Sequence, residues 1–108
     1  ALADAASDQF SVAAAHYSQR RWQLAADEFA AFLREWPLHA KAANARFFRG
    51  EALLQRREYE EARREFRRYV EHFGKDQFAR QAKYRIAEIG YLLEDHDQAR
   101  DDLRAFLR

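Results

Sequence analysis

The segment from residue 59 to residue 73 places apolar side chains at steps of three and four residues. These side chains belong to Tyr59, Ala62, Phe66, Tyr69, Val70 and Phe73. Most of the positions between them are arginine or glutamate. An apolar stripe with this period, bordered by charged residues, is typical of an amphipathic helix. The pattern therefore predicts a helix with one buried face over this segment.

The same stripe occurs three times along the chain, with a constant spacing of 37 residues. Its copies are Trp22, Ala25, Phe29, Phe32 and Leu33; Tyr59, Ala62, Phe66, Tyr69 and Val70; and His96, Ala99, Leu103, Phe106 and Leu107. An aromatic residue, Phe10, Phe47 or Tyr84, precedes each stripe by twelve residues. This distance accommodates one more helix before each stripe. Each repeat is therefore predicted to be a pair of helices.

Turn signals divide the three repeats into six predicted helices, over residues 7–19, 22–36, 40–56, 58–73, 77–94 and 96–108. Pro37 is expected to end the second helix, and Gly74, in a left-handed conformation, the fourth. We expect Asp76 to cap the fifth helix, and Asp95 with Gln98 to form a capping box at the sixth. The predicted fold class is all-α, with three antiparallel helix-turn-helix hairpins. We expect one domain over residues 1–108, with repeats at about 6–39, 43–76 and 80–108.

Charged side chains make up 34% of the chain, yet 19 cationic residues nearly balance 18 anionic ones. The net charge therefore offers no attraction to nucleic acid. Glu60 and Glu61 precede Arg64 by four and three residues, and Glu65 precedes Arg68 by three. Such pairs stabilise a helix by about 0.2–0.5 kcal/mol each. We interpret the arginine-rich segment as the solvated face of a helix and predict no nucleic-acid partner.

The sequence shows no pattern typical of a catalytic or metal site. The chain has no cysteine, and its four histidines, at 16, 39, 72 and 96, lack the short spacing of metal ligands. The acidic cluster at residues 94–97 offers several donors, but adjacent residues at a helix start cannot all face one ion. No run approaches the roughly 20 apolar residues of a membrane span. We predict no enzyme activity, no cofactor, no metal and no direct membrane insertion.

The stretch "FFRGEALLQRREYEEARREFRRYVEHFG" resembles the tetratricopeptide repeat. The resemblance rests on small residues in the first helix (Ala13, Gly50, Ala87), an alanine twelve residues later (Ala25, Ala62, Ala99) and a large apolar residue after that (Phe29, Phe66, Leu103). It implies a short right-handed superhelix in which each small pair lets two helices cross closely. The sequence departs from the family at Arg20, Arg57 and Glu94, where glycine is usual. Either these residues are left-handed, at about 1 kcal/mol each, or the turn is built differently.

The spacing of 37 residues exceeds the usual repeat length of about 34. Together with "FGKDQFARQAKYRIAE" and "WPLHAKAANARFFRGE", it is similar to the bacterial envelope branch of the family, which includes outer-membrane assembly lipoproteins and the periplasmic partner of the Tol-Pal system. This resemblance implies a periplasmic or cell-envelope location, while the residues themselves leave the compartment open. The absence of methionine, even at position 1, suggests a fragment of a longer protein. Apolar side chains at the last hairpin, Ile89, Leu92, Leu93 and Leu107, predict self-association or coverage there.

The resemblance implies a non-catalytic scaffold that binds a peptide or partner protein in a concave groove formed by the first helices. The groove residues would be Phe10, Ala14, Tyr17, Asn44, Phe47, Phe48, Glu51, Leu54, Gln55, Gln81, Tyr84, Arg85, Glu88 and Tyr91. We expect the polar members to be solvated and dispensable for packing. Each aromatic member could instead pack between adjacent hairpins. An alternative function is a purely architectural segment of a longer solenoid.

Overall fold

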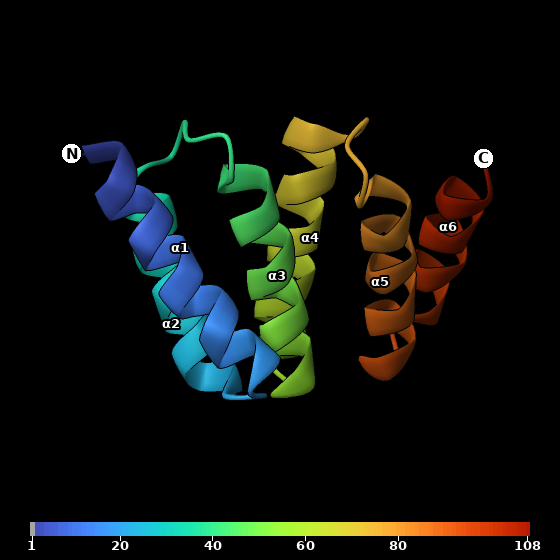
Figure 1. Ribbon diagram of the computed structural model, residues 1–108. Helices are drawn as coiled ribbons and strands as arrows, with labels where there is room; N and C mark the ends of the chain where they lie inside the picture. Colours follow the sequence, from blue (N-terminus) through green and yellow to red (C-terminus); the bar gives the residue numbers. More distant parts are fainter. Residues whose placement is uncertain (1) are drawn as a thin grey trace.

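The computed structural model of the protein describes residues 2–108, and these residues form six helices and no strand (Figure 1). The helices are α1 (Leu2–Ser18), α2 (Trp22–Glu35), α3 (Ala42–Gln55), α4 (Tyr59–Phe73), α5 (Ala79–Leu92) and α6 (His96–Leu107). Each helix packs against the next one along the chain. In Figure 1, α1 lies in front of α2 and α3 in front of α4, while α6 lies to the right of α5. The predicted all-α solenoid of three hairpins is confirmed, and the handedness of its superhelix stays a prediction.

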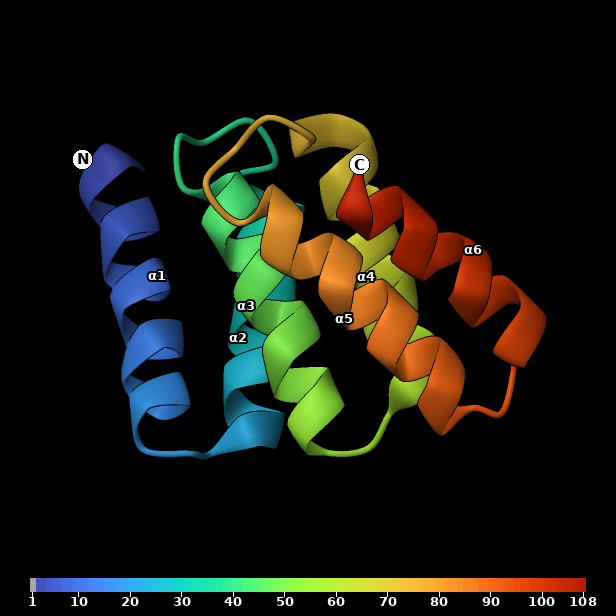
Figure 2. The ribbon, with the colours of Figure 1, turned by 90° about the vertical axis from the view of Figure 1, so that its right-hand side faces the viewer.

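The helix bounds differ from the predicted ones in ways that follow from the turns. Helix α1 begins at Leu2 rather than at residue 7. Helix α2 ends at Glu35, because Trp36 precedes Pro37 and takes an extended φ of −131°. The turns before α3 and α5 extend to Lys41 and Phe78, which postpones both helix starts by two residues. The three hairpins stack side by side in chain order, and Figure 2 shows this stack from the C-terminal end.

The tight turn inside each hairpin contains a left-handed residue that is not glycine. The φ angles of Arg20, Arg57 and Glu94 are 60°, 63° and 60°. In the middle hairpin, the N–H of Arg57 donates to the carbonyl of Leu54 at 2.9 Å, and that of Glu58 to the carbonyl of Leu53 at 3.0 Å. The other two turns repeat this pattern. This pair of hydrogen bonds is the Schellman motif, so the three turns form this motif without glycine.

Replacing Arg57 by glycine is expected to raise the free energy of unfolding by about 1 kcal/mol. Glycine adopts the left-handed conformation without the steric cost that a Cβ atom adds. Arg56, at φ −83°, is the matched control, and Arg56→Gly should destabilise the protein instead. Urea denaturation followed by circular dichroism measures both changes. Equal effects of the two substitutions would contradict a conformational cost at Arg57.

Three predicted helix caps are wrong. Gly74 has φ −61° and ψ −11°, so it continues the right-handed turn of α4. The N-cap of α5 is Phe78, without a side-chain cap, and Asp76 contributes its backbone carbonyl to Ala79 at 3.0 Å. At α6, Asp95 is the N-cap residue but its side chain makes no capping bond. Its carboxylate lies 3.6 Å from Arg63 instead, because α4 brings that cation close to the turn.

The core is aromatic in its centre and lined by alanine at the helix crossings. Phe47 is 2% exposed and stacks on Phe78 with 4.5 Å between ring centroids. Phe66 and Tyr69, each in edge contact with Phe47, are also buried. The phenol oxygen of Tyr69 accepts a hydrogen bond from the Phe78 N–H at 3.2 Å. One aromatic cluster therefore joins the second hairpin to the turn that leads into the third.

Glycine allows close helix crossings at two places, one of them unforeseen. A Cβ atom on Gly50 would lie 2.9 Å from the ring of Phe66, which is fully buried. The predicted partner, Ala62, is not among its three nearest contacts. A Cβ atom on Gly90 would lie 2.9 Å from the Cβ of Ala99. A close Gly–Ala crossing lies between α5 and α6, at a glycine that the repeat comparison did not select, and the contact of Gly50 with Ala62 stays a prediction.

Candidate partner-binding surface

The residues predicted to line the groove divide into buried and accessible members. The prediction that Phe47 lines the groove is wrong, because the second and third hairpins enclose this residue in the core. The partly buried aromatic and aliphatic members, Phe10, Tyr17, Phe48 and Leu54, pack against the core. Ala14 and Asn44 are also partly buried. This half of the predicted surface is therefore largely engaged in packing, which is the alternative stated for its aromatic members.

The accessible members lie mostly on α5. Gln55, Gln81, Tyr84 and Tyr91 are exposed, and Arg85 and Glu88 are partly exposed. Tyr84 and Tyr91 are 43% and 51% exposed, unusually high for large aromatic residues. Their spacing of seven residues places them on one face of the helix, two turns apart. The candidate surface therefore contracts to the exposed face of α5.

Arg85 ties this face to the second hairpin through a buried carboxylate. Its Nε lies 2.7 Å from Oε1 of Glu51, and its Nη2 donates to Oε2 of the same residue at 3.2 Å. Its Nη1 also lies 3.0 Å from Glu88. The expectation that Glu51 is solvated and dispensable is wrong, since it is 6% exposed. Arg85 thus bridges the two equivalent carboxylates of neighbouring hairpins.

Burial and charge shift two pKa values in this network. Burial raises the pKa of the Tyr17 phenol above its ordinary value of 10.0, and nearby Glu51 raises it further while Arg85 opposes the shift. For Arg85, burial alone would lower the pKa, but its hydrogen bonds and attraction to Glu51 and Glu88 raise it. A neutral phenol and a permanently charged guanidinium are suited to a structural role. The network therefore links α3 to α5 through charged side chains.

A hollow of about 320 Å³ opens beside α5. It is lined by Tyr84, Ala87, Glu88, Tyr91, Leu92 and Leu103. Sequence reasoning selected Tyr84, Glu88 and Tyr91 for the groove but left out Ala87 and Leu103. The resemblance had identified Ala87 as a helix-crossing position and Leu103 as the large apolar position of the repeat, and these are the signals that could have placed them here. The hollow combines two phenol rings, a carboxylate and an aliphatic floor.

The apolar edge predicted at the last hairpin is only partly exposed. Leu92 and Leu107 are 49% and 67% exposed, in line with the expectation. Ile89 is fully buried and Leu93 packs against the core, because both turn inward from α5. Self-association through this edge would therefore depend on Leu92 and Leu107, and it stays a prediction.

Among the side chains that the structure describes, no three histidine, aspartate or glutamate residues are grouped as metal ligands. Among the helices described, none has both the length and the apolar character to cross a membrane.

Comparison with known proteins identifies a repeat family. A family model described as "Tetratricopeptide repeat" matches residues 13–78 and again residues 49–108. A search of curated proteins found no match to the chain. The two matches overlap over residues 49–78, which hold most of the second hairpin, as expected for units that repeat in register. They agree with the resemblance seen in the sequence, while its envelope branch is not distinguished by them.

Proposed function

Because the chain belongs to the tetratricopeptide repeat family, whose repeats generally mediate protein–protein interaction without catalysis, we propose that it binds a partner polypeptide along the exposed face of α5. The hollow beside Tyr84 and Tyr91 would be the centre of this contact. Aromatic side chains supply large contact areas at low entropic cost, which suits them to binding surfaces.

The internal repeat supports this proposal by providing an occupied copy of the hollow. A shift of 37 residues converts its lining into Phe47, Gly50, Glu51, Leu54, Gln55 and Phe66. In that copy, Phe78 stacks on Phe47 and Arg85 binds Glu51. Helix α5 and the turn before it thus cover the surface over the second hairpin. The hollow on the third hairpin has the same kind of lining, and no helix among the described residues covers it.

The occupied copy also indicates the chemistry of the partner. Arg85 follows Phe78 by seven residues, and the two reach a carboxylate and an aromatic ring of the preceding hairpin. Tyr84 and Glu88 present a ring and a carboxylate at the equivalent positions. We therefore expect the partner to insert an amphipathic helix carrying an aromatic residue and, about two turns later, a cationic one.

Selection of peptides from a phage-displayed helical library on the purified chain tests the proposal. The selected peptides are expected to bind with at least about tenfold lower affinity when Leu92 is replaced by alanine, because that side chain lines the hollow. Leu24 is the matched control, since it is 48% exposed on α2 and Leu92 is 49% exposed on α5. Peptides that bind both variants equally, or selection of no peptide at all, would contradict the proposal and favour the architectural alternative.

A location in the bacterial cell envelope is a finer part of this proposal. It rests on the spacing of 37 residues and on the resemblance of the two quoted stretches to the envelope branch. Fractionation of cells that express the full-length protein would test it. Recovery with the cytoplasmic fraction would contradict it.

A further inference from the structure

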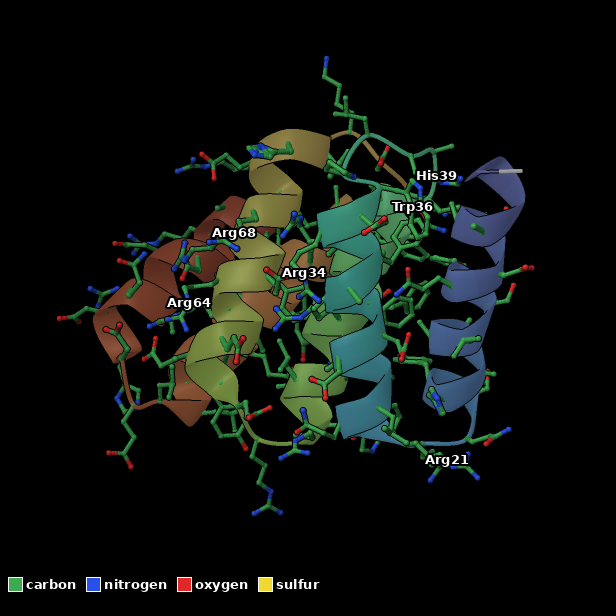
Figure 3. The ribbon with its side chains drawn as sticks, turned by 90° about the vertical axis from the view of Figure 1, so that its left-hand side faces the viewer. Arg21, Arg34, Trp36, His39, Arg64 and Arg68 are labelled. Carbon is green, nitrogen blue, oxygen red and sulfur yellow. The ribbon has the colours of Figure 1, made fainter. Side chains whose placement is uncertain are left out.

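A basic cleft lies between α2, α3 and α4, away from the hollow on α5. Its volume is about 250 Å³. It is lined by Ala30, Leu33, Arg34, Arg46, Arg49, Glu65 and Arg68. Figure 3 shows Arg34 and Arg68 on the side of the molecule that α2 and α4 form. Four guanidinium groups therefore share this cleft with one carboxylate.

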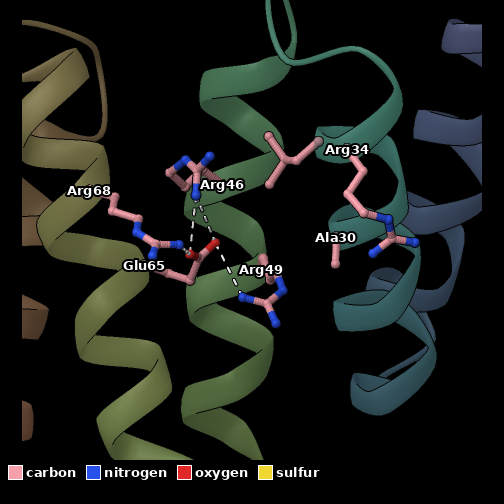
Figure 4. Close-up of a pocket in the computed structure, with 7 residues that line it drawn as sticks. Ala30, Arg34, Arg46, Arg49, Glu65 and Arg68 are labelled. Carbon is pink, nitrogen blue, oxygen red and sulfur yellow. Dashed lines mark hydrogen bonds and ion pairs between the residues drawn. The ribbon is translucent and has the colours of Figure 1, made fainter.

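Glu65 lies at the floor of the cleft and contacts three of the arginines (Figure 4). Its carboxylate accepts hydrogen bonds from Arg46 at 3.1 Å and from Arg68 at 3.4 Å, and it lies 3.4 Å from Arg49. The Glu65 side chain is only 3% exposed, so it sits inside the group of cations. Arg34 lies on the other rim, with its guanidinium directed away from Glu65 in Figure 4.

The arginines of the cleft carry more N–H donors than its carboxylate can accept. Each guanidinium carries five N–H groups, and one carboxylate has about four acceptor positions. The Nε of Arg49 is buried and has no hydrogen-bond partner, although its Nη2 donates to Glu61 at 2.8 Å. The sequence analysis predicted that the arginines form ion pairs within their own helix, and the pair of Arg68 with Glu65 confirms this for Arg68. The predicted pairing of Arg64 with Glu60 or Glu61 is wrong, because Glu60 pairs with Arg63 and Glu61 with Arg49.

The next pair of hairpins carries the repeat equivalent of this cleft. Its lining is Arg67, Val70, Lys83, Ile86, Asp102 and Ala105, each 37 residues after a member of the first cleft. Asp102 replaces Glu65 and pairs with Arg67 at 3.1 Å. Ile86 and Ala105 stand where the first cleft has Arg49 and Arg68. The fold therefore forms this junction with a single carboxylate and only two cations.

The first cleft has more cations and a larger volume than the equivalent junction between the next hairpins. Arg49 and Arg68 add two cations that the equivalent junction lacks. Ala30 stands where Arg67 enters the second cleft, and the volume rises from about 130 Å³ to about 250 Å³. Gathering like charges is unfavourable unless an anion joins them. Glu61 and Glu65 neutralise part of this surplus. Four guanidinium groups around two carboxylates still leave a net positive charge, which is typical of a binding site for an anionic group.

We propose that this arginine cleft binds an acidic peptide segment, whose carboxylate enters the space that Ala30 leaves open. Guanidinium groups form strong charge-assisted hydrogen bonds with carboxylates, and Arg46 and Arg49 already donate to Glu65 and Glu61. Leu33 supplies an apolar wall for the aliphatic stem of a glutamate side chain. Arg34 and Arg68 on opposite rims would take further carboxylates of the same segment, which favours a peptide over a single small ion.

The test measures binding of fluorescein-labelled hexaglutamate to the purified chain by fluorescence anisotropy at low salt. The triple variant A30R/R49I/R68A carries the residues of the second cleft, so its side chains suit the fold. It is expected to bind the peptide at least about tenfold more weakly. Arg104→Ala, on the exposed surface of α6, changes the net charge by the same amount and should bind like the unmodified chain. Circular dichroism checks that each variant remains helical, and the single variant Arg68→Ala, at an exposed side chain, replaces the triple variant if the latter unfolds.

The single variant Ala30→Arg distinguishes binding inside the cleft from general electrostatic attraction to the chain. It adds a cation while filling the cleft, so the site proposed here predicts weaker binding and a bulk charge effect predicts stronger binding. Stronger binding to Ala30→Arg would overturn the proposal, as would absence of hexaglutamate binding. Binding of inorganic pyrophosphate without binding of hexaglutamate would also overturn it, in favour of a phosphate site. The α5 surface is a different face, so neither result depends on the helix-binding proposal.

Discussion

Phe47→Ala is expected to lower the free energy of unfolding by about 3–5 kcal/mol, the cost of removing a fully buried aromatic ring. Phe47 contacts the rings of Phe66, Tyr69 and Phe78, so its loss leaves a cavity at the junction of two hairpins. The buried neighbours cannot easily collapse into that space. Urea denaturation monitored by circular dichroism measures the change. A fall in the denaturation midpoint without a change in slope would show that stability alone is affected.

The repeat supplies the matched control for this substitution. Tyr84 is equivalent to Phe47 but is 43% exposed and packs mainly on Phe106, with 5.5 Å between ring centroids. Tyr84→Ala should therefore cost about 1 kcal/mol or less. Equal losses at the two positions would mean that the third hairpin does not enclose Phe47 in solution.

Arg85→Ala is expected to destabilise the protein by about 2–3 kcal/mol, because it leaves the Glu51 carboxylate buried without its cation. Breaking a buried ion pair on one side costs about 3–5 kcal/mol, and the exposed part of Arg85 reduces that figure. The double variant Glu51→Ala/Arg85→Ala removes both charges. It should be less destabilised than the sum of the two single variants. Strict additivity in this double-mutant cycle would show that the pair contributes no coupling across the α3–α5 interface.

The hairpins could be predicted well from the sequence because they arise from local patterns of apolar residues. An apolar stripe with a helical period, repeated every 37 residues, defines which segments are helices and which face is buried. The left-handed turns at Arg20, Arg57 and Glu94 were one of two stated alternatives, and the structure selects it. The caps were harder, since Gly74 and Asp76 have suitable residue types but lie in a turn closed by backbone bonds.

The candidate surface was harder to predict because it depends on contacts between hairpins. A helical stripe shows that Phe47 and Tyr84 are equivalent, but it cannot show that Phe78 covers only the first of them. The ion pair of Glu51 with Arg85 joins residues 34 positions apart, beyond the reach of any pairing rule within a helix. The arginine cleft likewise combines residues from three helices. Each arginine in it is ordinary on its own helix, and the surplus becomes visible only when α2, α3 and α4 pack.

The neighbour-to-neighbour packing of the six helices has a consequence for how the protein opens. Most tertiary contacts join successive helices, so the loss of one terminal helix leaves the others largely in place. Helix α6 buries Ala99 as its one fully buried residue, whereas α3 buries eight residues and α4 four. Amide hydrogen exchange should accordingly be fastest in α6 and slowest where α3 meets α4. The α6 side of the hollow would then be the part of the surface that unfolds most readily, while the arginine cleft sits on the most slowly exchanging helices.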